Sequence, residues 1–212
     1  MRIAVVGAGM VGGMLARAWA KAGHEVYLGV REPKAGKYQA LAKELGAKGR
    51  LGTVPQACAE SEAVLLAVPW DQARSAVKAA GDLKGKVILD CTNPIRFQGR
   101  EISMVPGLAT SGAEQIASWA PEADVFKIFN HVGAGLMDHP DFKGCNPLMC
   151  VCGDDESRKP EVLKLASELG FEAVDAGKLR AARFLEPLAG LWLQLAVTQE
   201  MGSNIAFALL KK

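Results

Sequence analysis

Three glycines near the start of the chain are spaced to bind a phosphate group. Gly7, Gly9 and Gly12 follow the pattern G-x-G-x-x-G, between a short apolar run and a segment rich in alanine and leucine. In a strand–turn–helix unit the first glycine permits a tight turn, the second lets a pyrophosphate approach the backbone, and the third lets the helix pack on the strand. The amino end of the helix adds unpaired N–H groups and a positive dipole. The loop therefore predicts dinucleotide binding; the alternative is a glycine-rich turn without a ligand.

The end of the next apolar segment bears on which dinucleotide is bound. An NAD-binding chain usually has an acid here that accepts from the ribose hydroxyls. With residues 24–29 as the strand, Val30 takes that position and Arg31 follows it. A guanidinium can pair with a 2′-phosphate, and Lys34 adds positive potential, so the segment favours NADP. Glu32 leaves the opposite open, because a shifted turn would bring its carboxylate to the ribose.

Segments after three later strands could border the rest of such a cofactor. Pro69 fixes the backbone beyond the third main strand, and Trp70 offers a flat apolar face unless it is a core or interface tryptophan. Asn93 could hydrogen-bond the nicotinamide amide, and a segment of small residues after a later strand leaves space for stacked rings. The expected cofactor-binding residues here are Val68, Pro69, Trp70, Asn93, Asn130, His131, Val132, Gly133 and Ala134.

His131 is the only candidate for acid–base catalysis among these residues, since an unperturbed imidazole has a pKa of about 6.5. Hydride transfer between two rings does not require a proton carrier, so we assign no catalytic residue with certainty. The five cysteines are irregularly spaced and odd in number. We expect them to be buried small apolar side chains and predict no metal site.

Apolar runs that read as strands alternate with helical patterns almost throughout the chain, which predicts a parallel sheet covered on both faces. The fold class is therefore α/β, a Rossmann-type doubly wound parallel sheet with a small C-terminal α/β extension. We expect a nucleotide-binding domain over 1–130 and an extension over 131–212 that contributes to the acceptor pocket. Long loops are expected over 93–111 and 133–147. The predicted strands cover 2–7, 24–30, 63–68, 86–91, 125–129, 148–152 and 171–175, and the predicted helices cover 10–22, 37–45, 71–80 and 156–169, with a helix start at Thr53.

Four segments carry a resemblance to a known family. These are RIAVVGAGMVG, VPWDQA, FNHVGA and, above all, the stretch from Val151 to Ala189. Together they resemble the coenzyme F420-dependent NADP oxidoreductase family, and the reductase domain of the STEAP metalloreductases is similar in the same places. The resemblance implies transfer of hydride between NADP(H) and the deazaflavin F420.

The resemblance also implies roles for individual residues. Ala8, Gly9, Met10 and Val11 would hold the pyrophosphate, Val30 and Arg31 the 2′-phosphate, and the segment 130–134 would lie between nicotinamide and deazaflavin. Two positions depart from the family pattern. Val30 stands where a serine is expected, so Arg31 carries more of the NADP preference, and His131 stands where a threonine is expected.

Composition excludes several other classes. The 212 residues are 50% hydrophobic with a net charge of +2, which argues against a disordered chain, and no dense basic block suggests a nucleic-acid partner. No secretory signal or membrane span is visible, so we expect a cytoplasmic protein that does not contact a membrane. Apolar residues at helical spacing after residue 184 predict either a helix that closes the sheet or a homodimer surface.

Two other functions stay open on the sequence. One is an NADPH-dependent reductase of a flavin, a quinone or a ferric complex. The other is a non-catalytic module that senses NADP(H), which the shortness of the chain favours slightly. In the enzymatic readings the partner is a small-molecule redox acceptor.

Overall fold

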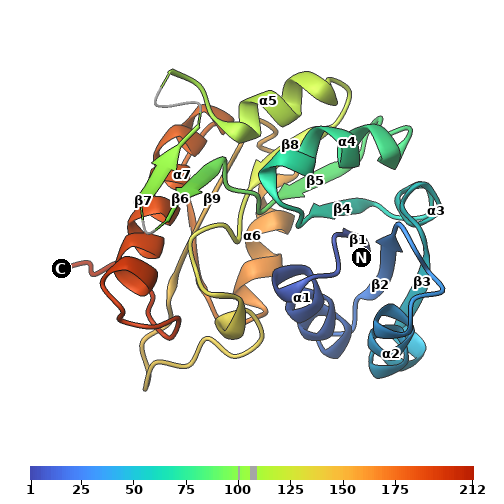
Figure 1. The fold of residues 1–212 in the computed structure, drawn as a ribbon, viewed down its shortest axis with the longest axis horizontal. Coiled ribbons are helices and arrows are strands. Elements are labelled where there is room, and N and C mark those ends of the chain that lie inside the picture. Colours follow the sequence, from blue (N-terminus) through green and yellow to red (C-terminus); the bar gives the residue numbers. More distant parts are fainter. Residues whose placement is uncertain (100, 106–108) are drawn as a thin grey trace.

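The computed structural model describes residues 1–99, 101–105 and 109–212. A single large sheet is built from β1 (Arg2–Val6), β2 (Glu25–Val30), β3 (Gly49–Thr53), β4 (Ala63–Leu66), β5 (Val87–Asp90), β8 (Asp124–Lys127), β9 (Leu148–Gly153) and β10 (Glu172–Asp175). The strand order is β10-β9-β8-β5-β4-β1-β2-β3, and all neighbours run parallel except β8 and β9 (Figure 1). The chain reverses direction across the sheet between β1 and β4. This is the doubly wound Rossmann-type arrangement that the sequence predicts.

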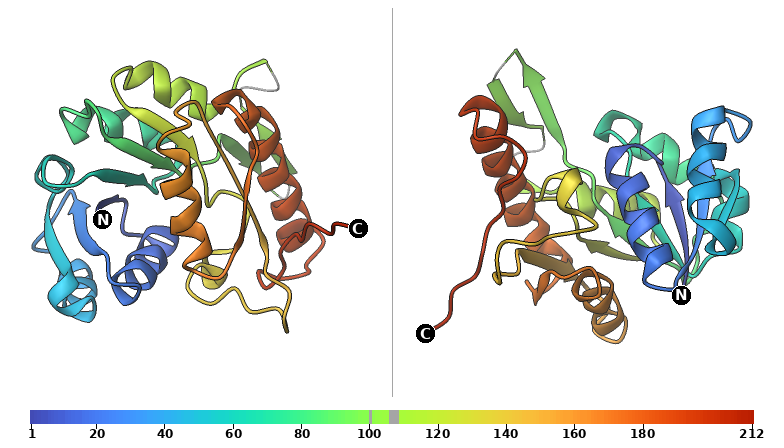
Figure 2. Two further views of the ribbon diagram at one scale, coloured as in Figure 1. Left: turned by 180° about the vertical axis from the view of Figure 1, so that it is seen from behind. Right: turned by 90° about the horizontal axis from the view of Figure 1, so that it is seen from below.

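Helices cover both faces of this sheet (Figure 2). They are α1 (Met10–Lys21), α2 (Gly36–Glu44), α3 (Val54–Ala59), α4 (Trp70–Ala80), α5 (Gly112–Trp119), α6 (Lys159–Ser167) and α7 (Ala182–Leu193). Buried residues of α1, α2 and α6 share one core cluster, and those of α3, α4, α5 and α7 share the other. Because successive strand residues point to opposite faces, Ile3 and Val5 belong to the first cluster and Ala4 and Val6 to the second.

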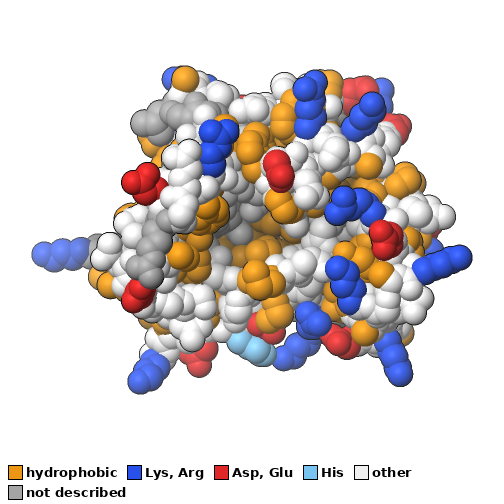
Figure 3. Space-filling view, viewed as in Figure 1, with side chains coloured by type: hydrophobic (Ala, Val, Ile, Leu, Met, Phe, Trp, Pro, Cys, Tyr) orange, Lys and Arg blue, Asp and Glu red, His pale blue; other side chains and the backbone are white. Residues whose placement is uncertain are grey.

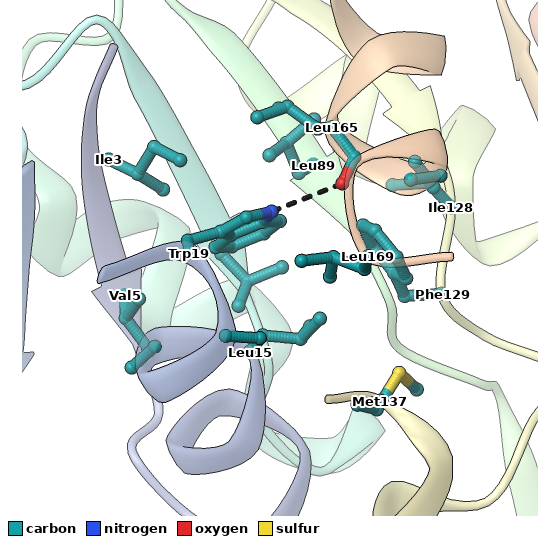
Figure 4. Packing of buried hydrophobic residues seen from close by; sticks show 14 of the residues in the cluster. Ile3, Val5, Leu15, Trp19, Leu89, Ile128, Phe129, Met137, Leu165 and Leu169 are labelled. Atoms are coloured by element: carbon teal, nitrogen blue, oxygen red, sulfur yellow. Dashed lines mark hydrogen bonds between the residues drawn. The ribbon is translucent and has the colours of Figure 1, made fainter. Parts of the chain in front are cut away.

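Trp19 is the centre of the first core layer. Its ring is fully buried, and its Nε1 donates to the carbonyl of Leu165 at 3.2 Å, which ties α1 to α6 (Figure 4). The ring of Phe129 lies edge-on to it at 5.6 Å between centroids. A buried indole needs a partner for its N–H, so this contact fixes the position of the helix that follows the glycine loop.

Local sequence signals explain where several helices begin and end. Gly23 has a φ of +99° just after α1, a conformation that glycine adopts without strain. Thr53 and Gln56 form a capping box at the start of α3. The helix over 71–80 is confirmed as α4, with Pro69 as its N-cap residue and Asp71 in its first turn. The sequence indicates Asp71 as a candidate N-cap, and the structure shows that this prediction is wrong.

Four strands differ from the sequence prediction. The expected loop over 93–111 contains a hairpin of β6 (Ile95–Gln98) and β7 (Glu101–Met104), while residues 100 and 106–108 of that loop lie outside the described part. The strand β3 was not predicted, because its sequence GRLGT has two glycines and no apolar run. The strand β9 runs antiparallel to β8, a direction that an apolar run cannot reveal.

The C-terminal residues lie along the molecule as an extended segment after α7 (Figure 2). The Leu148 N–H donates to the carbonyl of Phe207 at 2.8 Å, and Trp192 Nε1 donates to the carbonyl of Ile205 at 2.7 Å. The expected division near residue 130 stays a prediction, although β9 and β10 extend the same sheet. Within the described ranges, no helix combines the length and the apolar character that crossing a bilayer would need.

Candidate cofactor site

The glycine loop between β1 and α1 is built around two close backbone approaches. Gly7 has a φ of +98°, and a Cβ there would lie 2.3 Å from the carbonyl oxygen of Ala67. A Cβ on Gly12 would lie 2.1 Å from the carbonyl oxygen of Gly7. Any side chain at either position would therefore push the loop away from the end of β4, as the glycine pattern predicts.

The outer side of the same loop is open. A Cβ on Gly9 would meet no atom within 4 Å, and the neighbouring Met10 side chain is 82% exposed. The first turn of α1 has no acidic residue, and no side chain caps its N-terminus. Its amide groups are therefore available to an anion, which the helix dipole would also favour. This open backbone fits a pyrophosphate.

A cavity of about 450 Å³ extends from this loop along the carboxyl edge of the sheet. Seven of the predicted residues border it: Gly7, Ala8, Gly9, Val30, Arg31, Val68 and Pro69. Its wall is mostly apolar. The face of the molecule that Figure 3 draws also has a hollow near its centre, with hydrophobic side chains around it. The volume and lining suit the adenosine part of a dinucleotide.

Sequence reasoning missed the opposite wall of this cavity. Gln72, Ser75, Ala76 and Ala79 line it from α4, and Tyr38 lines it from α2, together with Val54. The α4 residues are spaced three, four and seven apart, so they share one helical face. That spacing, immediately after a strand that ends beside the glycine loop, is the signal that could have identified them.

Charge at the rim of the cavity comes from Arg31. Its side chain is exposed, and in the part of the chain that the structure describes no carboxylate pairs with it. Glu32 is also exposed but does not border the cavity, and Lys34 is exposed on the next turn. The free guanidinium matches the 2′-phosphate of NADP better than the bare ribose of NAD.

Trp70 lies outside the cavity lining. Its ring stacks on Trp119, with 5.6 Å between centroids, and a Cβ on Gly112 would lie 2.9 Å from it. The side chain is thus engaged with α5 and packs between α4 and α5. This arrangement corresponds to the core or interface alternative considered for this tryptophan.

Asn93 and Asn130 meet although they follow different strands. Asn93 Nδ2 donates to the backbone carbonyl of Asn130 at 2.7 Å, and Asn130 Nδ2 donates to Asn93 Oδ1 at 3.0 Å. Both residues lie at the carboxyl edge of the sheet, after β5 and β8. Asn93 is half-buried and keeps one N–H and an oxygen lone pair, so it could recognise the carboxamide of a nicotinamide. Asn130 donates both Nδ2 hydrogens within the protein and its Oδ1 is buried, so it holds Asn93 in place.

His131 is buried, with 1% of its surface exposed. The Cys150 N–H donates to His131 Nε2 at 3.1 Å, so Nε2 carries no proton and the neutral ring has its proton on Nδ1. Burial lowers the pKa of His131 to about 4. The ring is therefore neutral near pH 7 and binds the β9 backbone, and this geometry gives it no evident role as an acid.

The two residues after Val132 in the small-residue segment have different surroundings. A Cβ on Gly133 would lie 2.6 Å from the carbonyl oxygen of Ser203 and 3.0 Å from the Trp192 ring, so this glycine accommodates the C-terminal segment. Ala134 begins a short 3₁₀ turn and is half-buried, and Val132 is buried. Cys58 and Cys152 are buried, as the sequence predicts for the cysteines, and Cys91 and Cys150 are half-buried. The prediction is wrong for Cys145, which is exposed.

Comparison with known proteins gives consistent matches. Residues 2–94 match the family model described as NADP oxidoreductase, coenzyme F420-dependent. A structure from Arthrobacter sp. FB24, described as a candidate F420-dependent NADP reductase, is 32% identical to this chain and has a TM-score of 0.90. The match covers 100% of this chain and 100% of that chain. A reductive aminase from Aspergillus terreus, solved with NADPH, is 21% identical with a TM-score of 0.68 over 94% of this chain and 62% of that chain. This last likeness concerns the fold alone.

A curated relative is similar over most of this chain. Metalloreductase STEAP3 of Rattus norvegicus is 29% identical over 192 residues, which make up 88% of this chain and 36% of that protein. The chain thus spans only about a third of the length of this relative, and a fifth, 20%, of human metalloreductase STEAP2.

Proposed function

Since the chain belongs to the coenzyme F420-dependent family of NADP oxidoreductases, we propose that it binds NADP(H) at the glycine loop and exchanges hydride between NADP(H) and a flat redox acceptor of the F420 type. The observation that carries this proposal is the open, uncapped backbone at Gly9 beside a 450 Å³ cavity whose rim bears the unpaired Arg31. The glycine loop, the apolar cavity wall and Arg31 are complementary to the pyrophosphate, the adenosine and the 2′-phosphate of NADP, in that order.

Different residues of the site bind different parts of NADP(H) in this proposal. Backbone amides of residues 8–11 hold the pyrophosphate, and the apolar wall from α4 and Val54 packs against adenosine. Arg31, with Lys34 nearby, pairs with the 2′-phosphate, and the cavity edge at Val68 and Pro69 leads toward the nicotinamide end. Each contact uses a group that is open in the structure, so binding requires no rearrangement of the sheet.

The acceptor would lie at the Asn93–Asn130 end of the sheet edge. When bound, NADPH would supply a hydride, which carries two electrons and one proton, to one ring atom of a flat acceptor, and the second proton of the fully reduced acceptor would come from solvent. The protein orients the nicotinamide with Asn93, which Asn130 holds in place. No side chain has to move a proton in this scheme, which agrees with the neutral, buried His131.

Calorimetry with NADPH and NADH tests the binding step. We expect NADPH to bind more tightly than NADH, and absence of binding by both at millimolar concentration would overturn the proposal. Oxidation of NADPH should then be followed with F420, FMN and a ferric chelate in parallel. Turnover with F420 alone supports the first acceptor.

A second candidate acceptor is a flavin or a ferric complex. It is favoured by the similarity of 88% of the chain to a protein named as a metalloreductase. Turnover with FMN or the ferric chelate, but not with F420, would select it. Tight NADPH binding without turnover on any of the three acceptors would instead favour a module that senses NADP(H).

A further inference from the structure

Three buried charged side chains meet below the Asn93–Asn130 pair and have no part in the function proposed above. The Lys127 ammonium contacts Asp90 Oδ2 at 2.7 Å and Glu186 Oε1 at 2.9 Å, and it donates to the carbonyl of Thr92 at 2.7 Å. All three charged side chains are at most 2% exposed. The ammonium thus has three oxygen partners, two ion-paired carboxylates and one hydrogen-bonded carbonyl, which come from the end of β5 and from α7.

The contacts continue from this ammonium into a closed ring. Thr92 precedes Asn93, whose side chain is bonded to Asn130. Asn130 Nδ2 also donates to the carbonyl of Leu185 at 2.9 Å, and the next residue in α7 is Glu186, which returns to the ammonium. The ring joins the loop after β5, the loop after β8 and α7. Asn93, proposed above to contact the nicotinamide, and Asn130, which holds it, are both members of this ring.

The charges are not needed to join the strands themselves. Asp90 and Lys127 are the last residue pair in the β5–β8 ladder, so backbone hydrogen bonds already hold the strands up to that point. An apolar pair could pack between the strands at lower cost than buried ions. What the ions add lies beyond the ladder: Glu186 accepts from the N–H groups of Gly112 and Ala113, at 2.9 and 3.1 Å, which brings α5 into the same junction.

Electrostatics keep the junction charged. Burial alone would lower the pKa of Lys127, but Asp90 and Glu186 outweigh it, so the pKa of the ammonium is raised above its usual value. The second negative charge is offset by the amino end of α5, where the Glu186 carboxylate binds two amides. Lys127 is therefore held in its charged form.

We propose that Lys127 is a positioning residue: it holds the Asn93–Asn130 amide pair, through the closed ring, in the geometry that the nicotinamide end of the bound cofactor requires. This inference rests on the proposed function. It does not concern the adenosine end, because none of the ring residues borders the cavity below the glycine loop.

The test compares a ligand that reaches the ring with one that does not. NADPH carries the nicotinamide, whereas 2′,5′-ADP represents only the adenosine end with its 2′-phosphate. Lys127→Met removes the ammonium, and Asn130→Asp opens the ring elsewhere by removing the Nδ2 donor to Asn93 and Leu185. The matched control is Lys159→Met. Lys159 is equally buried and is paired with Glu156 and Asp175 at 3.0 and 3.2 Å, but it is not part of the ring.

Calorimetry should show a selective loss of NADPH affinity in Lys127→Met and in Asn130→Asp. We expect NADPH affinity to fall by about tenfold or more, the value of roughly one hydrogen bond, while 2′,5′-ADP affinity stays within about twofold. The emission of bound NADPH should shift toward that of free NADPH, an outcome independent of turnover. Lys159→Met should lower the melting temperature and leave the ratio of the two affinities unchanged.

Two outcomes overturn the inference. One is an unchanged ratio of NADPH to 2′,5′-ADP affinity in Asn130→Asp, which applies even if Lys127→Met fails to fold. The other is a parallel loss of both affinities in Lys127→Met, which would make the lysine structural only. Failure of the wild-type protein to bind either ligand would be a different result, because it contradicts the proposed function itself.

Discussion

We expect the choice between NADP and NAD to depend on Arg31. Its guanidinium is exposed at the cavity rim, and no described carboxylate neutralises it. We expect Arg31→Ala to weaken NADPH binding by about tenfold, since an exposed charge-assisted hydrogen bond contributes roughly 1.5 kcal/mol. NADH affinity should change little, and apparent KM for NADPH should rise with kcat nearly constant.

Glu32→Gln is the control for Arg31→Ala, because Glu32 is the carboxylate that a shifted turn would bring to the ribose. It should leave both affinities nearly unchanged. If Glu32→Gln weakens NADH binding while Arg31→Ala leaves the discrimination intact, the assignment of the 2′-phosphate to Arg31 is incorrect.

A second prediction at the scale of a single residue concerns His131 and the pH dependence of stability. Burial lowers its pKa from 6.5 to about 4, so between these values the unfolded chain binds more protons than the folded one. Stability from this group is therefore complete above pH 6.5 and is lost as the pH falls toward 4. Between pH 7.5 and pH 5 we expect a loss of about 2 kcal/mol in the free energy of unfolding.

His131→Gln tests this origin of the pH dependence, since a glutamine oxygen can accept from the Cys150 N–H and does not titrate. Urea unfolding at the two pH values should show a smaller difference for the variant than for the wild type. Equal differences in both proteins would assign the acid sensitivity to other groups.

At the scale of elements, Gly133 joins the loop after β8 to the C-terminal segment. A Cβ there would lie 2.6 Å from the Ser203 carbonyl oxygen, which is backbone and cannot rotate away. We expect Gly133→Ala to lower the free energy of unfolding by about 1–3 kcal/mol, as other overpacked sites do. Gly135→Ala is the matched control, because a Cβ there meets no atom within 4 Å.

Chemical denaturation measures this difference between the two glycine variants, and the emission of Trp192 reports whether the C-terminal segment has moved. Similar unfolding curves for both variants would mean that the segment yields to the added methyl group.

The predictability of these elements follows from the range of the interactions that form them. The glycine loop, the apolar strands, the helix over 10–22 and the helix start at Thr53 are encoded by neighbours in sequence, and they were predicted. The pairing of β6 with β7 and the direction of β9 depend on partners elsewhere. The same applies to the site: residues 7–12 were recognised, but the Lys127 ring, which joins residues up to 96 positions from one another, was not.

At the scale of the whole molecule, α7 carries large apolar side chains that are exposed on the surface. Ala182 and Leu185 pack into the second core cluster, as expected for a helix that closes the sheet, but Phe184 is 72% and Leu191 49% exposed. They are seven residues apart and so share one face of the helix. Exposed apolar faces of this kind mark interaction sites, and we expect a homodimer through α7.

Light scattering coupled to size exclusion should give twice the 22.5 kDa mass of the chain. Phe184→Glu should give the single mass, whereas Leu210→Glu, at a residue 88% exposed in the C-terminal segment, should remain a dimer. A wild-type mass of 22.5 kDa at micromolar concentration would contradict the prediction.

The exposure of Arg31 has a consequence for any assay of this protein. Charges in contact with bulk water are screened by dissolved ions, over about 10 Å at 0.1 M and about 3 Å at 1 M. NADPH, which carries the 2′-phosphate, should therefore lose its advantage in affinity over NADH as potassium chloride is added. Salt should affect the contribution of the pyrophosphate equally in the two cofactors, because both carry it. Selectivity measured in dilute buffer will thus exceed the selectivity at the ionic strength of a living cell.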